Sequence, residues 1–195
     1  FDKYFTGYTY NPDKTRILLE EAGFPEGKGL LPIKLTTTAD YLDLCEYIQQ
    51  QLSQFGIEIS IDVSTGGTFR EMVSNSKLEF FRGSWIADYP DAENYLALFY
   101  SKNFSPGGPN YTHFADTKYD ELYEKSMFET CDSIRLEYYK QMNQMIIDKA
   151  VVVPLYYDEV VRFVQKDISG FEGNAMNLLN LKYVKKHLPN DINSR

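Results

Sequence analysis

The feature that restricts the fold most lies in the first half of the chain. There, short segments with alternating apolar and polar residues are separated by amphipathic segments. Residues 32–38 and 57–63 alternate apolar and polar side chains, as a strand with one buried face does. Residues 78–81 predict a third, short and aromatic strand. Between them, residues 40–55 and 66–73 repeat apolar side chains at helical spacing. Since such alternation favours parallel strands with right-handed crossovers, the sequence predicts an α/β fold with an open, mostly parallel sheet flanked by helices.

Further elements are predicted on both sides of this sheet. Asn11 and Pro12 are typical of a helix start, and Gly23 is typical of its end. Gly56 is likewise typical of the end of the helix predicted over 40–55. Two late helices are expected to cover the sheet, and Asp132 is expected to cap the second of them. The remaining predictions are a helix over 92–100, a polar loop over 101–112, helices over 117–127 and 133–149, extended chain over 151–157 and 160–164, and a strand over 181–184.

Composition limits the class of protein. The 195 residues are 43% hydrophobic and 25% charged, as in a folded globular chain, and this length allows one domain, or one large lobe and a fragment of another. A net charge of -8 argues against nucleic acid as a partner. The sequence has neither a membrane-spanning apolar run nor a signal peptide, so an exported protein would contain this chain as an internal fragment.

Cysteine and histidine predict no metal or cofactor site. Cys45 and Cys131 have no CxxC spacing, and Cys45 falls on the apolar face of a predicted helix. His113 and His187 stand far apart, without a neighbouring ligand at metal spacing. We therefore interpret Cys45 as a core residue and both histidines as surface or loop residues.

The residues after the predicted third strand form the candidate site. Arg82, the single tryptophan Trp85 and the carboxylate of Asp88 follow within a few positions. Ligands of open α/β sheets bind outside the carboxyl ends of the strands. Gly83 would let another backbone approach, Trp85 offers a flat apolar wall, and Asp88 is an anion for a bound cation. The sequence therefore predicts a binding groove for an amine-bearing ligand.

Simpler interpretations of the same residues stay open. Asp88 precedes a Tyr-Pro pair and has ordinary turn chemistry, and Arg82 can pair with a surface carboxylate. Asp88, Asp91 and Glu93 resemble a calcium loop in composition, although the spacing of an EF-hand is missing. Asp88 and Asp91 also allow a glycoside hydrolase, whose carboxylate separation no sequence argument fixes.

Several motifs, in this order and spacing, resemble the C-terminal part of the family-five extracellular solute-binding proteins. These are the oligopeptide- and dipeptide-binding components of ABC importers. The matching residues are Tyr10-Asn11-Pro12, Ala22-Gly23-Phe24-Pro25, Phe55-Gly56-Ile57, Trp85-Ile86-Ala87-Asp88-Tyr89-Pro90-Asp91, Val153-Pro154-Leu155-Tyr156-Tyr157 and Asn180-Leu181-Lys182-Tyr183-Val184.

The resemblance implies a non-enzymatic, two-lobed receptor that closes over its ligand, with a periplasmic-binding-protein-like (type II) fold. Residues 1–166 would form the second lobe, and residues 167–195 a return segment toward a first lobe outside this chain. The expected partners are a peptide or other small solute, that first lobe and an ABC transporter permease. The protein is expected to be a monomer in the periplasm or outside the cell, anchored to the membrane.

The resemblance also implies roles for the site residues. Asp88 would pair with the α-amino group of a peptide, and Arg82 would meet a ligand carboxylate. Backbone groups of Gly83, Ser84, Trp85 and Ile86 would bond an extended peptide by strand addition. Tyr89 and Tyr157 are expected to reach the groove, and Asn110 lies in the polar loop that would border it. Relatives that carry nickel chelates or sugars keep this fold, so those solutes are the alternative ligands.

Overall fold

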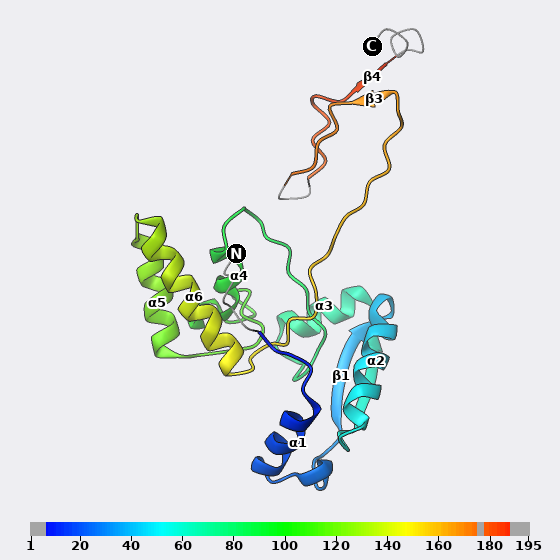
Figure 1. The fold of residues 1–195 in the computed structure, drawn as a ribbon, viewed down its shortest axis with the longest axis vertical. Coiled ribbons are helices and arrows are strands. Elements are labelled where there is room, and N and C mark those ends of the chain that lie inside the picture. Colours follow the sequence, from blue (N-terminus) through cyan, green and yellow to red (C-terminus); the bar gives the residue numbers. More distant parts are fainter. Residues whose placement is uncertain (1–6, 175–177, 188–195) are drawn as a thin grey trace. The chain divides into compact units, whose positions relative to one another are not determined.

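The computed structural model describes residues 7–174 and 178–187 (Figure 1). The chain divides into two compact units, each described here by itself. The first contains Phe1–Trp85 and Tyr95–Val153, and the second contains Ile86–Asn94 and Pro154–Arg195. The predicted lobe and return segment also include residues 1–6, 175–177 and 188–195, which lie outside the described residues.

Two parallel strands form the sheet of the first unit. β1 (Ile33–Thr38) pairs with β2 (Ile59–Ser64) in the register Ile33 to Ile59. On the other edge of β1, the Thr36 N–H donates to the Phe80 carbonyl and the Arg82 N–H donates to the Thr36 carbonyl, each at 3.1 Å. The parallel order is therefore confirmed. The third strand shortens from the predicted 78–81 to a single bridge at Phe81, where only the two bonds to Thr36 join it to β1.

Helices and turns precede, connect and follow these strands along the chain. They are α1 (Pro12–Glu21), the 3-10 helices η1 (Pro25–Gly27) and η2 (Ala39–Tyr41), α2 (Leu42–Ser53) and α3 (Gly66–Ser74). α2 lies along β1 (Figure 1). The core buries Leu35, Cys45 and Ile59, which confirms Cys45 as a core residue.

Two local predictions in this region are confirmed by geometry. The side chain of Asn11 accepts the Lys14 N–H at 2.9 Å and caps α1. Gly56, predicted to end a helix, has a φ of 72° and lies against Gly27, which has the same φ. A Cβ at Gly27 would come within 2.2 Å of the Gly56 carbonyl oxygen, so this close approach requires glycine.

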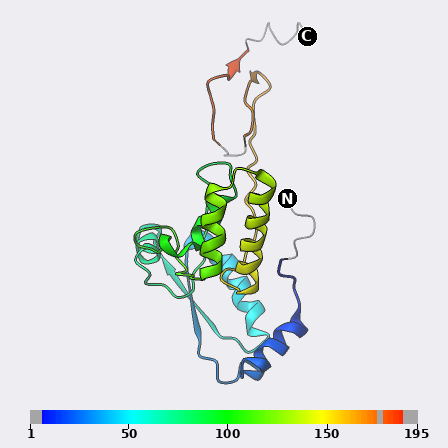
Figure 2. The same ribbon diagram turned by 90° about the vertical axis from the view of Figure 1, so that its left-hand side faces the viewer.

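A second core forms around the late helices rather than over the sheet. α5 (Thr117–Phe128) and α6 (Asp132–Asp148) lie side by side (Figures 1 and 2). The predicted helix over 92–100 is shorter, with α4 (Glu93–Leu96) followed by the 3-10 helices η3 (Ala97–Phe99) and η4 (Ser101–Asn103). The expectation that these helices cover the sheet is wrong, because their apolar faces pack on each other. The buried residues of this core are Leu96, Tyr100, Tyr119, Leu122, Tyr123, Tyr139, Met142 and Ile146. Asp132 is the first residue of α6 rather than its cap.

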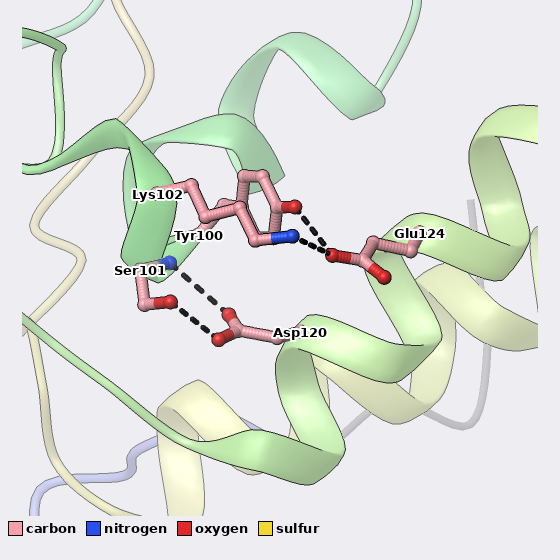
Figure 3. Close-up of polar contacts among 5 residues, drawn as sticks. All are labelled: Tyr100, Ser101, Lys102, Asp120 and Glu124. Atoms are coloured by element: carbon pink, nitrogen blue, oxygen red, sulfur yellow. Dashed lines mark hydrogen bonds and ion pairs between the residues drawn. The ribbon is translucent and has the colours of Figure 1, made fainter.

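Polar contacts fix the chain before the polar loop onto α5 (Figure 3). Both the backbone N–H and the hydroxyl of Ser101 donate to the carboxylate of Asp120. The Tyr100 hydroxyl and the Lys102 ammonium each donate to Glu124 at 2.6 Å. The bond from Lys102 lowers the pKa of the Glu124 carboxyl. These bonds therefore fix the beginning of the loop over 101–112 to α5.

Asp116 links the two ends of this helical body. Its carboxylate accepts the Tyr119 N–H at 3.0 Å as the cap of α5, and it pairs with Lys149 at 3.0 Å. Both contacts favour the ionised form and lower the pKa of Asp116. We expect Asp116→Ala to lower the free energy of unfolding by about 1 kcal/mol at neutral pH, measured by urea denaturation.

A second substitution, Asp116→Asn, tests a pH dependence. A lowered folded-state pKa stabilises the protein above the ordinary value of 3.8, and this contribution is lost as the pH falls through the lowered pKa. Asp116→Asn is therefore expected to make stability less sensitive to acid as the pH falls below 3.8. Asp13→Asn, in an exposed pair with Arg16, serves as the control and is expected to change little. An acid response of Asp116→Asn equal to that of the unchanged protein would contradict the assignment.

The last part of the chain contains little regular structure. β3 (Ile168–Ser169) pairs with β4 (Lys185–Lys186) in antiparallel fashion. The predicted strand over 181–184 is wrong, because Asn180 accepts the Lys182 N–H and the Leu181 carbonyl accepts the Val184 N–H, which makes a turn. Residues 152–164 belong to no strand, and apolar side chains such as Phe163 are exposed. None of the helices in the described ranges is long and apolar enough to cross a membrane.

Candidate functional site

Arg82 is held at the edge of the sheet in the first unit. Its backbone N–H bonds the Thr36 carbonyl, and its guanidinium carbon lies 3.2 Å from the centre of the Tyr41 ring. Tyr41 ends η2, the turn that directly follows β1. The arginine therefore lies where the prediction put it, after the third segment of the sheet. Tyr41 falls within the helix predicted over 40–55, and no sequence signal links it to Arg82.

The three residues after Arg82 leave the sheet. Gly83 and Ser84 are exposed and Trp85 is half-buried. A Cβ at Gly83 would meet only the Phe81 ring, at an ordinary 3.6 Å. Packing within the first unit therefore does not require glycine at this position. Because Gly83 is exposed, its backbone is accessible.

Asp88 lies in a tight turn of the second unit, and this turn fixes its backbone. The Asp88 N–H donates to the side-chain oxygen of the buried Asn94 at 3.2 Å. Asp91 caps the following helical turn, since its carboxylate accepts the Glu93 N–H at 2.9 Å. The Tyr89 hydroxyl donates to the Glu93 carboxylate, and this bond raises the pKa of Tyr89. Asn94 was not predicted, because an asparagine six positions from Asp88 gives no recognisable signal.

The carboxylate of Asp88 takes no part in holding the turn. Asp88 is exposed, and within its own unit the described residues give its carboxylate no hydrogen bond or ion pair. The cap of this turn is Asp91 instead. The interpretation of Asp88 as a turn or helix cap therefore does not hold for its side chain. What remains is an exposed anion on a backbone fixed by Asn94.

Asn110 is the predicted site residue with the clearest structural role. It is fully buried, and its side-chain nitrogen donates to the carbonyls of Tyr100 at 3.1 Å and Phe114 at 3.0 Å. Its side-chain oxygen accepts the Thr112 hydroxyl at 3.0 Å. These bonds hold the polar loop closed on itself. A contact between Asn110 and a ligand stays a prediction.

The predicted residues thus fall into two groups, one in each unit. Arg82, Gly83, Ser84 and Trp85 belong to the first unit, together with Asn110; Ile86, Asp88, Tyr89 and Tyr157 belong to the second, where Ile86 and Tyr157 are widely exposed. Across the described ranges, no three histidine, cysteine or acidic residues gather as metal ligands would. Chemically, the first group offers a cation and backbone groups, and the second group offers an anion.

Solved structures of periplasmic binding proteins share the fold of this chain. The ABC transporter-associated periplasmic binding protein DppA from Helicobacter pylori, in complex with the peptide STSA, has a TM-score of 0.79 at 21% identity over 96% of this chain and 37% of that one. NikZ from Campylobacter jejuni, in complex with Ni(L-His), has a TM-score of 0.68 at 21% identity over 77% and 33%. The predicted α/β fold of the periplasmic binding proteins is thereby confirmed.

The chain belongs to the bacterial extracellular solute-binding proteins of family 5, a family of non-enzymatic receptors. A family model described as "Bacterial extracellular solute-binding proteins, family 5 Middle" matches residues 1–107. The Dipeptide-binding protein of Escherichia coli (strain K12) is 24% identical over 168 residues, which are 84% of this chain and 31% of that protein. The chain spans about a third of the length of the curated relatives it matches. The predicted resemblance is therefore confirmed.

Proposed function

We propose that this chain is the second lobe of a receptor that binds peptides for uptake through an ABC transporter. The observation that supports this proposal is the exposed carboxylate of Asp88. Asn94 holds the backbone of Asp88 through a hydrogen bond, and no described residue of the same unit neutralises the carboxylate. A fixed and unpaired carboxylate suits the α-amino group of a peptide, because a charge-assisted bond is roughly twice as strong as a neutral one. Asp88 is the amine-binding residue in this proposal.

Neighbouring residues supply the other contacts of an extended peptide. Arg82 is assigned to a ligand carboxylate, and the backbone of residues 83–86 to the peptide backbone. Tyr89 and Tyr157 are exposed and are assigned to the ligand's side chains. Recognition of this kind reads termini and backbone, so it tolerates many peptide sequences.

The names of the matching proteins support a peptide as ligand. One curated relative is called a dipeptide-binding protein, and a solved structure with the same fold holds the peptide STSA. The second candidate is a metal chelate, which the fold match to NikZ with Ni(L-His) favours. The two candidates differ in the role of Asp88, because an amine that ligates nickel is not the free ammonium group that the peptide proposal assigns to this carboxylate.

The remaining parts of the receptor follow from the same proposal. Residues 1–166 form the second lobe, residues 167–195 return toward a first lobe outside this chain, and the ligand lies between the lobes. Closure of the lobes then presents the loaded receptor to a permease. The receptor is a monomer that acts on the outer side of the cytoplasmic membrane, in the periplasm or anchored outside the cell.

Blocking the ligand's amine tests this function. We expect the full-length protein to bind short peptides with a free amine at least tenfold more tightly than the same peptides with an acetylated amine, because acetylation removes the charge that Asp88 neutralises. Isothermal titration calorimetry measures both affinities. Native mass spectrometry of the protein purified without refolding identifies the retained ligand. Equal affinity for both peptide forms, or a retained nickel chelate, would overturn the peptide proposal.

A further inference from the structure

Arg82 and Tyr41 form the closest cation–aromatic stack among the described residues. The guanidinium carbon lies 3.2 Å from the ring centre, whereas the comparable distance for Arg16 and Phe55 is 5.4 Å. A separation as small as the thickness of an aromatic ring requires the planar cation to lie over the ring face.

Both partners of this stack are fixed to the same strand. The backbone N–H of Arg82 bonds the Thr36 carbonyl of β1 at 3.1 Å. Tyr41 closes η2, which begins directly after β1, and the next N–H in the chain bonds the Ala39 carbonyl. β1 therefore holds both partners: the backbone of Arg82 is bonded to it, and the turn that carries Tyr41 directly follows it. Together these contacts set the position of the guanidinium.

Stacking leaves the binding edge of the guanidinium available. The five N–H donors of arginine lie in the plane of the group, so a ring beneath one face covers none of them. Arg82 is half-buried, and no carboxylate among the described residues of the first unit pairs with it. An arginine fixed in this way binds a carboxylate through two parallel bonds with little further loss of side-chain freedom.

We propose that Tyr41 is a positioning residue that holds the guanidinium of Arg82 ready for a ligand carboxylate. Through this contact, Tyr41 makes the receptor select ligands with a free carboxylate over the same ligands with that group blocked. The inference rests on the proposed peptide-binding function and adds to it a preference for the acid form. Lysine at position 82 would keep the charge but lose the flat stack and the two-bond geometry.

A peptide with a free carboxylate and its C-terminal amide test the inference in the full-length protein. Calorimetry is expected to show that the unchanged protein prefers the acid form about tenfold or more. Tyr41→Leu is expected to lower this preference about fivefold by weakening the acid form alone. Tyr41→Phe, which keeps the ring face, is expected to restore it. In an Arg82→Lys background, Tyr41→Leu is expected to have no further effect, because Tyr41 acts through Arg82.

Two results of these titrations would overturn the inference. One is an equal loss of affinity for both peptide forms in Tyr41→Leu, which indicates a merely structural role. The other is an additive effect of Tyr41→Leu and Arg82→Lys. Failure of the proposed function gives a different result: free-amine and acetylated peptides then bind equally, while the preference for the acid form still responds to Tyr41.

A measurement without peptide tests the same contact. The Nε–H signal of Arg82 in an NMR spectrum is expected to carry a ring-current shift from Tyr41 that Tyr41→Leu removes. Acetate is expected to move this signal at lower concentration in the unchanged protein than in Tyr41→Leu. Equal acetate titrations in the two proteins would show that Tyr41 does not prepare Arg82 for an anion.

Discussion

Replacement of Asp88 by asparagine is expected to weaken the binding of free-amine peptides to the full-length protein about 100-fold. Asparagine keeps the size of the side chain and removes the charge that the ammonium group of the ligand needs. Because the Asp88 carboxylate holds no part of its own turn, the substitution leaves the bond from the Asp88 N–H to Asn94 in place. Isothermal titration calorimetry with one free-amine peptide and its acetylated form measures the effect.

Two controls separate a lost amine site from a damaged protein. The acetylated peptide is expected to bind the Asp88→Asn variant as it binds the unchanged protein, since it brings no charge to this position. Asp43→Asn, at an exposed position in the first turn of α2, removes the same charge from the first unit and is expected to leave both affinities unchanged. Unchanged affinity of Asp88→Asn for the free-amine peptide would exclude Asp88 as the amine site.

Tyr119→Ala is expected to cause the largest loss of stability, about 4 kcal/mol in the free energy of unfolding. Tyr119 is fully buried in the helical core, where its ring meets Phe114 edge-on at 5.5 Å. Its hydroxyl donates to the Leu96 carbonyl at 2.8 Å. The substitution creates a cavity in this core and leaves that carbonyl without this donor. Urea denaturation followed by circular dichroism measures the change.

Two variants separate the packing of Tyr119 from its hydrogen bond. Tyr119→Phe keeps the ring and is expected to cost only about 1 kcal/mol. Tyr10→Ala, at a widely exposed tyrosine, is expected to change stability by less than about 0.5 kcal/mol. If Tyr119→Ala were no more destabilising than Tyr10→Ala, the helices would not share the core described here.

The elements that the sequence predicted well depend on local patterns. Alternation placed β1 and β2, helical spacing placed α2, and Asn11 marked the start of α1. Each pattern is local because a strand or an amphipathic helix exposes one face along its own length. The position of Arg82 at the sheet edge follows from the same reasoning, since it needs only the order of the elements.

The predictions that failed depended on which surfaces meet. The apolar faces of α5 and α6 show that these helices bury something, but they do not identify the partner, and the two helices pack on each other. The residues around 181–184 are apolar enough for a strand, yet Asn180 turns the chain there. A local side-chain bond of this kind competes with a weak strand preference over so short a segment.

The sequence by itself determined the α/β class, the family and the candidate residues Arg82 and Asp88, because these depend on periodicity and on motifs along the chain. Only the tertiary structure decided that Tyr41 lies beneath Arg82, that Asn94 holds the Asp88 turn, and that Asn110 is buried in its loop. Each of these contacts joins residues brought together by the path of the backbone. Their strength depends on distance and burial, which no pattern of residue types encodes.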